Sequence, residues 1–147
     1  MRDVSESKKR TWTAESELTV QFYDLDPMEV VWHGNYAKYF EVGRCALLDQ
    51  IDYSYAQMKA SGYAWPVIDL HVRYLQPMTF GQVVIVRAEI VEWEHRLKLQ
   101  YAIRDKASGL RLTKGTTMQV AVDLSTKLMC LQSPAVLFDR LGVSPSW

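Results

Sequence analysis

The sequence predicts an α+β fold in which an antiparallel sheet carries one long helix on a single face. Apolar side chains recur every three or four residues over residues 35–51, as they do along one face of an α-helix. From Trp65 onward the apolar period changes to two, which is typical of half-buried strands. Short turns join most of these later strands, and strands joined by short turns pair antiparallel.

The chain of 147 residues is long enough for one compact domain with a substantial core. We expect residues 1–15 to form a flexible tail and residues 16–147 to form the single domain. Seventeen basic and 17 acidic side chains leave no formal net charge, so the chain lacks the basic excess of a general nucleic-acid binder. No stretch approaches 18 uninterrupted apolar residues, and no membrane span is expected.

The N-terminal residues contain no apolar segment of the kind that secretory signal peptides carry. Cys45 and Cys130 are too few for a disulfide framework, and we expect reduced thiols in a cytoplasmic protein. The three histidines, His33, His71 and His95, show no paired spacing to other metal ligands, so no metal site is expected.

The first strand is expected over residues 18–23, where polar and apolar side chains alternate before an acidic loop. The long helix follows over residues 35–51. Gly43 lies in the middle of its apolar face, where glycine costs about 1 kcal/mol relative to alanine. Close approach of the helix to another backbone, such as a sheet wrapped around it, accounts for a glycine at this position.

The remaining elements follow from the alternating pattern and from turn residues between them. In the last strand, Met118, Val120 and Val122 form one alternating set of side chains. In chain order we expect a short helix over 54–60, strands over 67–74, 84–93, 97–104 and 110–123, and a terminal helical turn over 134–141.

Polar and aromatic residues are densest in the loop of residues 24–36, between the first strand and the long helix. A loop that leads into a helix N-terminus offers free backbone N–H groups and the positive end of the helix dipole, which stabilise an oxyanion. Asp26 and His33 add a carboxylate and an imidazole, so a nucleophile or general base for acyl hydrolysis is available. The alternative is structural, with Asp24 and Asp26 making turn hydrogen bonds and His33 capping the helix.

Residues 24–36, Asp-Leu-Asp-Pro-Met-Glu-Val-Val-Trp-His-Gly-Asn-Tyr, resemble the signature loop of hotdog-fold thioesterases of the 4-hydroxybenzoyl-CoA thioesterase type. That loop reads Asp-x-Asp, a small residue or proline, x-Gly, two aliphatic residues, an aromatic residue, His or Tyr, and x-Asn-Tyr. The resemblance continues through residues 39–41, resumes at residues 72–77 with Gly81, and covers the chain from about residue 18 to residue 123.

The resemblance implies a hotdog fold, in which a five-stranded antiparallel sheet wraps around a long central helix. It implies a homodimer paired edge to edge, and often a homotetramer. The implied activity is that of an acyl thioesterase, which hydrolyses an acyl-CoA or acyl-carrier-protein thioester to the free acid and the thiol. No cofactor is implied beyond the coenzyme A or phosphopantetheine that enters as part of the substrate.

The resemblance also assigns roles to residues. The second acid of the Asp-x-Asp motif, Asp26, would be the catalytic carboxylate, acting as nucleophile or as the base that activates water. The backbone N–H of His33 would polarise the thioester oxygen. Trp32, Tyr36 and Trp65 are candidate lining residues of an acyl pocket built across the dimer interface, with plain core packing as the alternative for each.

Coenzyme A carries phosphates, which arginine and lysine side chains bind. Similar enzymes carry basic contacts just after the position of Trp93, and here Arg96 retains a full positive charge, with Lys98 two residues further on. An ordinary solvated face is the alternative. The neutral total charge fits weak attraction of phosphates, so an acyl-carrier-protein thioester stays open as a substrate.

The sequence departs from the family pattern at Glu29, which stands where the family has glycine. Glycine permits a positive φ, so a different path of the loop is one alternative. A Glu29 side chain that pointed inward would raise the pKa of Asp26 by like-charge repulsion. Glu41 on the long helix is a further candidate base, although pairing with Arg44 is the preferred interpretation.

Two other functions compete with hydrolysis. A hotdog dehydratase of 3-hydroxyacyl thioesters would use His33 and Glu41 as its histidine and acid, but the Asp-x-Asp-Pro loop argues against it. It would turn over enoyl thioesters without releasing thiol. A non-catalytic acyl-binding or assembly module, whose loop Glu29 has disabled, would bind a thioester and turn nothing over.

Overall fold

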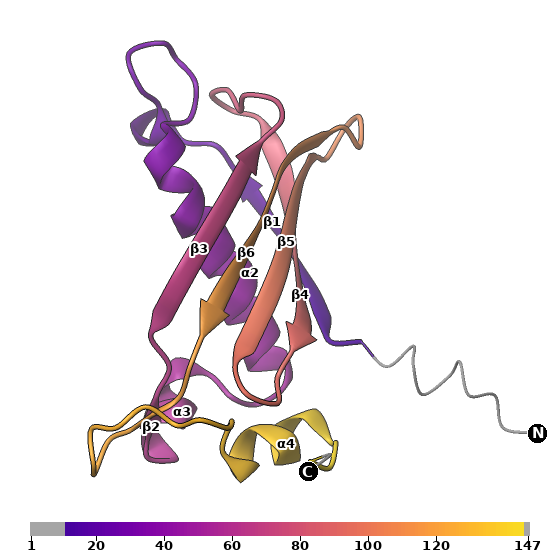
Figure 1. The fold of residues 1–147 in the computed structure, drawn as a ribbon. Helices are drawn as coiled ribbons and strands as arrows, with labels where there is room; N and C mark the ends of the chain where they lie inside the picture. Colours follow the sequence, from indigo (N-terminus) through magenta and orange to yellow (C-terminus); the bar gives the residue numbers. More distant parts are fainter. Residues whose placement is uncertain (1–10, 146–147) are drawn as a thin grey trace, which may run out of the picture.

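The computed structural model describes residues 11–145 and has the predicted α+β architecture. One long helix, α2 (Tyr36–Gln50), lies on one face of a five-stranded antiparallel sheet with strand order β1-β4-β5-β6-β3 (Figure 1). The five-stranded sheet and the long helix are therefore confirmed. The strands of this sheet are β1 (Thr13–Thr19), β3 (Val67–Tyr74), β4 (Val83–Glu92), β5 (Leu97–Asp105) and β6 (Arg111–Gln119).

The shorter elements gather at the two ends of this layer pair. The loop that leads into α2 lies at the same end of the molecule as the end of β3, whereas α3, β2 and α4 lie at the opposite end (Figure 1). Within residues 11–145, no helix has the length and hydropathy needed to cross a membrane. The shorter elements are η1 (Phe22–Asp24), η2 (His33–Asn35), α3 (Tyr55–Ala60), α4 (Ala135–Leu141), and the paired strands β2 (Tyr63–Ala64) and β7 (Val122–Asp123).

Two glycines allow α2 to pack closely against the sheet. A Cβ atom on Gly43 would lie 2.8 Å from Cγ1 of Val86 on β4, so the close approach expected at this glycine is confirmed. On β6, a Cβ atom on Gly115 would lie 2.6 Å from the ring of Phe40 and 2.4 Å from the carbonyl oxygen of His71. These contacts are well inside van der Waals distance, so a larger residue at either glycine would push helix and sheet apart.

The first strand begins earlier than the sequence predicted. Because β1 starts at Thr13, the expected flexible tail over residues 1–15 is wrong for residues 13–15, and the domain begins before residue 16. The expectation for residues 1–10 lies outside the described residues.

The first strand also ends earlier than the predicted range of 18–23. It stops at Thr19 because Gln21 and Asp24 form a capping box that starts η1. Ala14 and Leu18 of β1 pack against the core and alternate with polar residues, so the strand has an apolar period of two that begins within the expected tail. Exposed Glu15 adds an ion pair of 2.9 Å with Arg104.

β6 buries the more polar of its two faces. Thr113, Thr117 and Gln119 are all buried, whereas Met118, from the alternating apolar set, is half-buried. The predicted strand over 110–123 is also divided, since β6 ends at Gln119 and β7 pairs with a different strand. Of these side chains, Thr117 belongs to a polar network beneath α2, described below, and Gln119 donates to the carbonyl oxygen of Trp65.

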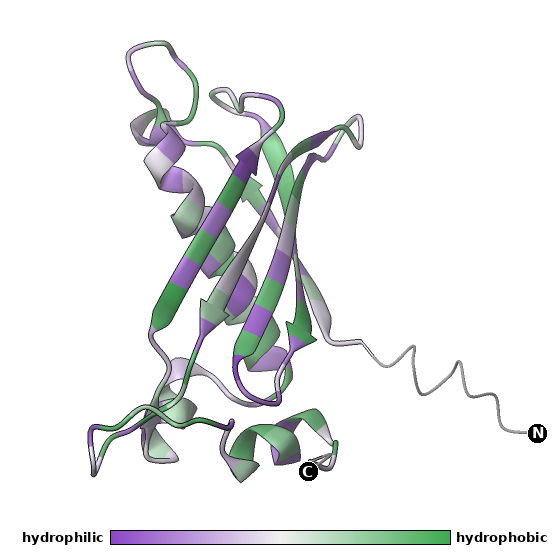
Figure 2. Cartoon of the chain, in the orientation of Figure 1, coloured by the Kyte–Doolittle hydropathy of each residue, from purple (hydrophilic) through white to green (hydrophobic). Residues whose placement is uncertain are grey.

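β3 is an edge strand that exposes apolar side chains. Apolar and polar residues alternate along it as green and purple bands (Figure 2). Val67, Ile68, Leu70 and Tyr74 are between 42% and 55% exposed. A long apolar edge with unpaired backbone groups is a template for pairing with another strand.

Candidate active site

The loop over residues 24–36 closes a tight turn around Asp26. The backbone N–H of Asp26 donates to the carbonyl oxygen of Val30 at 2.8 Å, and its carboxylate Oδ1 accepts from the N–H of Met28 at 2.8 Å. Its other carboxylate oxygen, Oδ2, has no hydrogen-bond partner among residues 11–145. The loop therefore fixes the orientation of the carboxylate while leaving one oxygen available.

Glu29 adopts the backbone conformation for which glycine is suited. Its φ is +65°, in the left-handed region, and its N–H donates to the carbonyl oxygen of Asp26 at 2.9 Å. The substitution has therefore not prevented a glycine-like turn. The side chain is exposed and is absent from the lining of the cleft that contains Asp26, so it points outward.

Asp24 holds the two ends of the loop together. Its buried carboxylate Oδ2 accepts from the hydroxyl of Tyr39 at 2.8 Å and from the N–H of Gln21 at 3.1 Å. Its carbonyl oxygen accepts from the N–H of Trp32 and from Nδ2 of Asn35, both at 2.9 Å. Burial raises the pKa of Tyr39, and Asp24 raises it further, so the phenol stays protonated and donates.

The turn η2 presents backbone N–H groups where α2 begins. The N–H of His33 has no acceptor in the described part of the chain, and the positive end of the α2 dipole lies directly behind it. The hydroxyl of Tyr74 donates to the carbonyl oxygen of His33 at 2.7 Å. A Cβ atom on Gly34 would lie 2.3 Å from the ring of Trp32, so this ring packs directly on the turn.

Asp26, His33 and Tyr36 line one cleft of about 330 Å³. Tyr36 is buried, and burial raises the pKa of its hydroxyl, with Tyr74 and Asp26 raising it further. The residues that line the cleft thus include a carboxylate, a neutral phenol and His33, whose backbone N–H is available. Its other lining residues are Met28, Val30, Val31, Tyr74, Leu75, Gln76 and Pro77.

Trp32 and Trp65 do not line this cleft. Trp32 is 48% exposed, and its ring centroid lies 5.1 Å from that of His33. Trp65 is buried just before β3 begins, where its Nε1 donates to the hydroxyl of Tyr53 at 3.3 Å. Within one chain, the structure therefore brings together Tyr36 and the loop but not Trp65.

Arg96 also lies away from the Asp26 cleft, in the hairpin between β4 and β5. Its Nε donates to Oε1 of Glu92 at 3.1 Å, and Nζ of Lys98 lies 3.7 Å from the other oxygen of the same carboxylate. Arg96 is about half exposed. A phosphate at this position would compete with Glu92 for both cations.

A second cavity, of about 560 Å³, lies at the start of β3. Its walls are aromatic and aliphatic, with Lys59 as the charged member and no carboxylate among the described residues that line it. The cavity suits an apolar group. Its lining consists of Tyr55, Met58, Lys59, Tyr63, Ala64, Trp65, Pro66, Val122 and Leu124.

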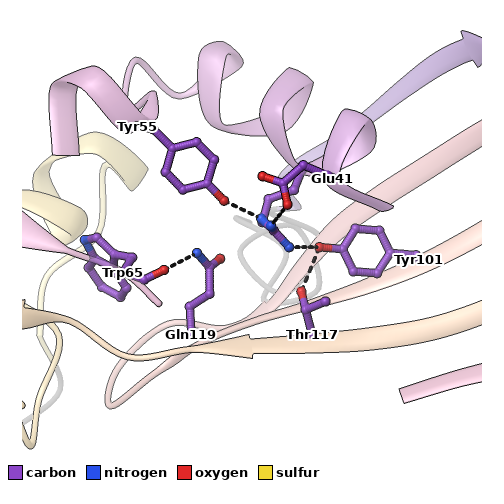
Figure 3. A network of polar contacts seen from close by, with 7 residues as sticks. Glu41, Tyr55, Trp65, Tyr101, Thr117 and Gln119 are labelled. Carbon is purple, nitrogen blue, oxygen red and sulfur yellow. Dashed lines mark hydrogen bonds and ion pairs between the residues drawn. The ribbon is translucent and has the colours of Figure 1, made fainter. Parts of the chain in front are cut away.

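Glu41 belongs to a polar network around the buried guanidinium of Arg44 (Figure 3). Besides its ion pair with Glu41, Arg44 donates from Nε to the hydroxyl of Tyr55 at 2.6 Å and from Nη1 to that of Tyr101 at 3.2 Å. The Tyr101 hydroxyl lies 2.7 Å from that of Thr117. Burial opposes the charge of Arg44, but both tyrosines help to hold its pKa above the usual value. The expected pairing of Glu41 with Arg44 is confirmed.

The sequence profile of the Thioesterase-like superfamily matches residues 20–139, which contain the loop, α2 and every strand except β1. The chain belongs to this superfamily. It is 30% identical over 111 residues to the protein named "Putative acyl-CoA thioesterase YneP" of Bacillus subtilis (strain 168), covering 75% of this chain and 80% of that one.

Two further comparisons agree. The chain is 32% identical over 88 residues to the chloroplastic acyl-acyl carrier protein thioesterase ATL3 of Arabidopsis thaliana, covering 60% of this chain and 46% of that one. The DHNA-CoA thioesterase from Staphylococcus aureus matches the structure with a TM-score of 0.75 at 28% identity, covering 81% of this chain and 80% of that one. The predicted hotdog fold and thioesterase activity are confirmed: the protein is a thioester hydrolase. Neither competing function is favoured.

Proposed function

We propose that the protein is an acyl-CoA thioesterase whose chemistry takes place in the cleft beside Asp26. The observation that carries this proposal is the pairing, in one cleft, of an oriented carboxylate with the available backbone N–H of His33. The N–H stabilises negative charge on the thioester oxygen while Asp26 attacks the carbonyl carbon or removes a proton from an attacking water. The carbon–sulfur bond breaks, and the products are the free acid and the thiol. The reaction uses no cofactor beyond the coenzyme A of the substrate.

A second copy of the chain completes the site in this proposal. The exposed apolar edge of β3 favours pairing with the same edge of another copy, which gives a homodimer. In an antiparallel pair, the end of one β3 lies beside the start of the other. The cleft at Tyr74 of one chain then meets the cavity at Trp65 of its partner, and the partner's Arg96 lies at that same end. Association of dimers into a homotetramer stays a prediction.

The acyl group would occupy the partner's apolar cavity. A cavity of about 560 Å³ falls in the range of small-molecule sites, and its aromatic walls suit an aryl or an aliphatic acyl group. Coenzyme A is favoured over a carrier protein because the relative named for acyl-CoA aligns over 75% of this chain and the one named for acyl carrier protein over 60%. Arg96 would leave its ion pair with Glu92 and bind a phosphate of coenzyme A instead.

The proposal also includes a cytoplasmic location, as the sequence predicted. Cys45 and Cys130 are both free thiols in the structure. A reducing compartment keeps such thiols free.

The test is thiol release from a panel of aryl and aliphatic acyl-CoAs by the wild type, Asp26→Asn and Glu29→Gln. We expect kcat to fall at least about a hundredfold in Asp26→Asn, because the amide neither attacks nor accepts a proton. Glu29→Gln changes an acid in the same loop whose side chain points outward, and it should retain the wild-type rate.

Other outcomes would redirect the proposal. Equal rates in Asp26→Asn and the wild type would move the chemistry to another acid, with Glu41 tested next. Thiol release from an acyl-carrier-protein thioester, but from no acyl-CoA, would make the carrier protein the natural carrier of the substrate in place of coenzyme A. Turnover of enoyl thioesters without free thiol would establish the dehydratase instead.

A further inference from the structure

Two separate contacts hold the turn at which α2 begins. On one side, the carbonyl oxygen of Asp24 accepts from the N–H of Trp32 and from the side chain of Asn35. On the other side, the hydroxyl of Tyr74 donates to the carbonyl oxygen of His33 at 2.7 Å. The first contact comes from the loop itself, whereas the second comes from the sheet.

The Tyr74 hydroxyl acts on a rigid group. The carbonyl of His33 is part of the planar peptide that also contains the N–H of Gly34. Fixing the carbonyl oxygen therefore fixes the direction of that N–H and limits rotation about the backbone of His33. The Tyr74 hydroxyl thus orients the N–H of Gly34 directly. The N–H of His33 belongs to the preceding peptide, so the hydroxyl acts on it by limiting rotation about the backbone of His33.

Tyr74 is itself well supported. Its backbone is paired with Thr113 of β6, and its ring meets the buried ring of Tyr36 edge-on, with centroids 4.8 Å apart. The hydroxyl is therefore anchored to the sheet and to the first residue of α2 rather than to the loop. It transmits the rigidity of the sheet to an otherwise exposed turn.

We propose that Tyr74 is a positioning residue for hydrolysis: its hydroxyl holds the His33 peptide so that the backbone donors stay directed at the thioester oxygen. This proposal rests on the proposed function of the Asp26 cleft. Preorganised donors stabilise a transition state because they need no reorientation during the reaction, and small displacements of reacting groups are costly. Tyr74 acts through the backbone of His33.

Tyr74→Phe tests the proposal because it removes the hydroxyl and keeps the ring that packs on Tyr36. We expect kcat to fall about tenfold, less than the loss of a whole oxyanion donor, with KM and the melting temperature unchanged. The pH profile should also stay unchanged, because Asp26 is untouched. Tyr23→Phe is the matched control. Tyr23 is 66% exposed, and its hydroxyl has no hydrogen bond within residues 11–145. The kcat of this variant should stay at the wild-type value.

A second measurement needs no activity. In NMR relaxation of backbone amides, Tyr74→Phe should lower the order parameters of His33 and Gly34 and leave that of Glu29 unchanged. Unchanged order parameters, an unchanged kcat in an active enzyme, or a loss of kcat matched by a lower melting temperature would overturn the proposal. An inactive wild type or a fully active Asp26→Asn would instead overturn the proposed function, while the amide relaxation would still test the role of Tyr74.

Discussion

The two cavities at the ends of β3 differ in both chemistry and size. The cleft at its end contains Asp26, Tyr36 and an available backbone N–H, in about 330 Å³. The cavity at its start has about 560 Å³ of aromatic and aliphatic wall and no carboxylate among its described lining residues. The strand between them has eight residues, or roughly 26 Å at about 3.3 Å per residue.

Under the proposed function, one chain separates reaction from recognition. The smaller cleft has the groups that hydrolysis needs, and the larger cavity has the apolar surface that an acyl group needs. Antiparallel pairing of two β3 edges would bring the Asp26 cleft of one chain beside the larger cavity of the other. Substitutions at the two ends should therefore change different kinetic constants, and a substitution on the edge between them should affect both.

The largest effect is expected from Leu70→Lys, in the middle of the β3 edge. Leu70 is 47% exposed in the single chain, so lysine should not prevent folding, but it would bring like charges together in a paired edge. We expect a monomer by light scattering and thiol release at least about a hundredfold lower. The control is Thr19→Lys on the opposite edge strand, β1, which should keep the wild-type mass and rate. A dimeric Leu70→Lys, or a fully active monomer, would contradict the shared site.

An intermediate effect is expected from Ala64→Phe, which fills the second cavity from β2. We expect KM to rise about tenfold, or about 1.4 kcal/mol, for aryl and long-chain acyl-CoAs, with kcat unchanged. KM for acetyl-CoA should stay the same, because its acyl group does not reach the cavity. Ala60→Phe, exposed at the end of α3, is the control. The same KM change for acetyl-CoA would mean that the cavity does not hold the acyl group.

The smallest effect is expected from Glu29→Gly in the loop over residues 24–36. Glu29 has φ +65°, where a side chain costs about 1 kcal/mol or more and glycine is free of this strain, although glycine loses more entropy on folding. We expect the free energy of unfolding, measured in urea, to rise by about 0.5 kcal/mol, with an unchanged rate of thiol release. Glu29→Ala removes the carboxylate but keeps Cβ, and it should give no gain. An equal gain in Glu29→Ala would assign the effect to charge instead of backbone strain.

The sequence determined those features that depend on residues close together in the chain. α2 and strands β4 and β5 were predicted because one face of each is buried and its apolar period is visible, whereas β3 was predicted from alternation along an exposed edge strand. The residues of the Asp26 cleft are also close together in the chain, since Asp26, His33 and Tyr36 fall within eleven consecutive residues. Trp32 lies in the same stretch but does not line the cleft, so local spacing indicated the region and not each member.

Features that depend on contacts distant in the chain were decided by the tertiary structure. The start of β1 was misplaced because pairing with β4 extends the strand into the segment expected to be a tail. β6 buries Thr117 and Gln119 because the buried hydroxyl of Tyr101, which accepts from Arg44, and the carbonyl oxygen of Trp65 need polar partners.

The candidate site shows the same division. Trp65 and Tyr74 belong to the same stretch of sequence, yet β3 carries them to opposite ends of the molecule. The bond from Tyr74 to the carbonyl of His33 joins residues 41 positions apart, and no local pattern encodes its distance or direction. Side-chain type and spacing determine which groups are available, whereas only the packing of helix against sheet determines which of them meet.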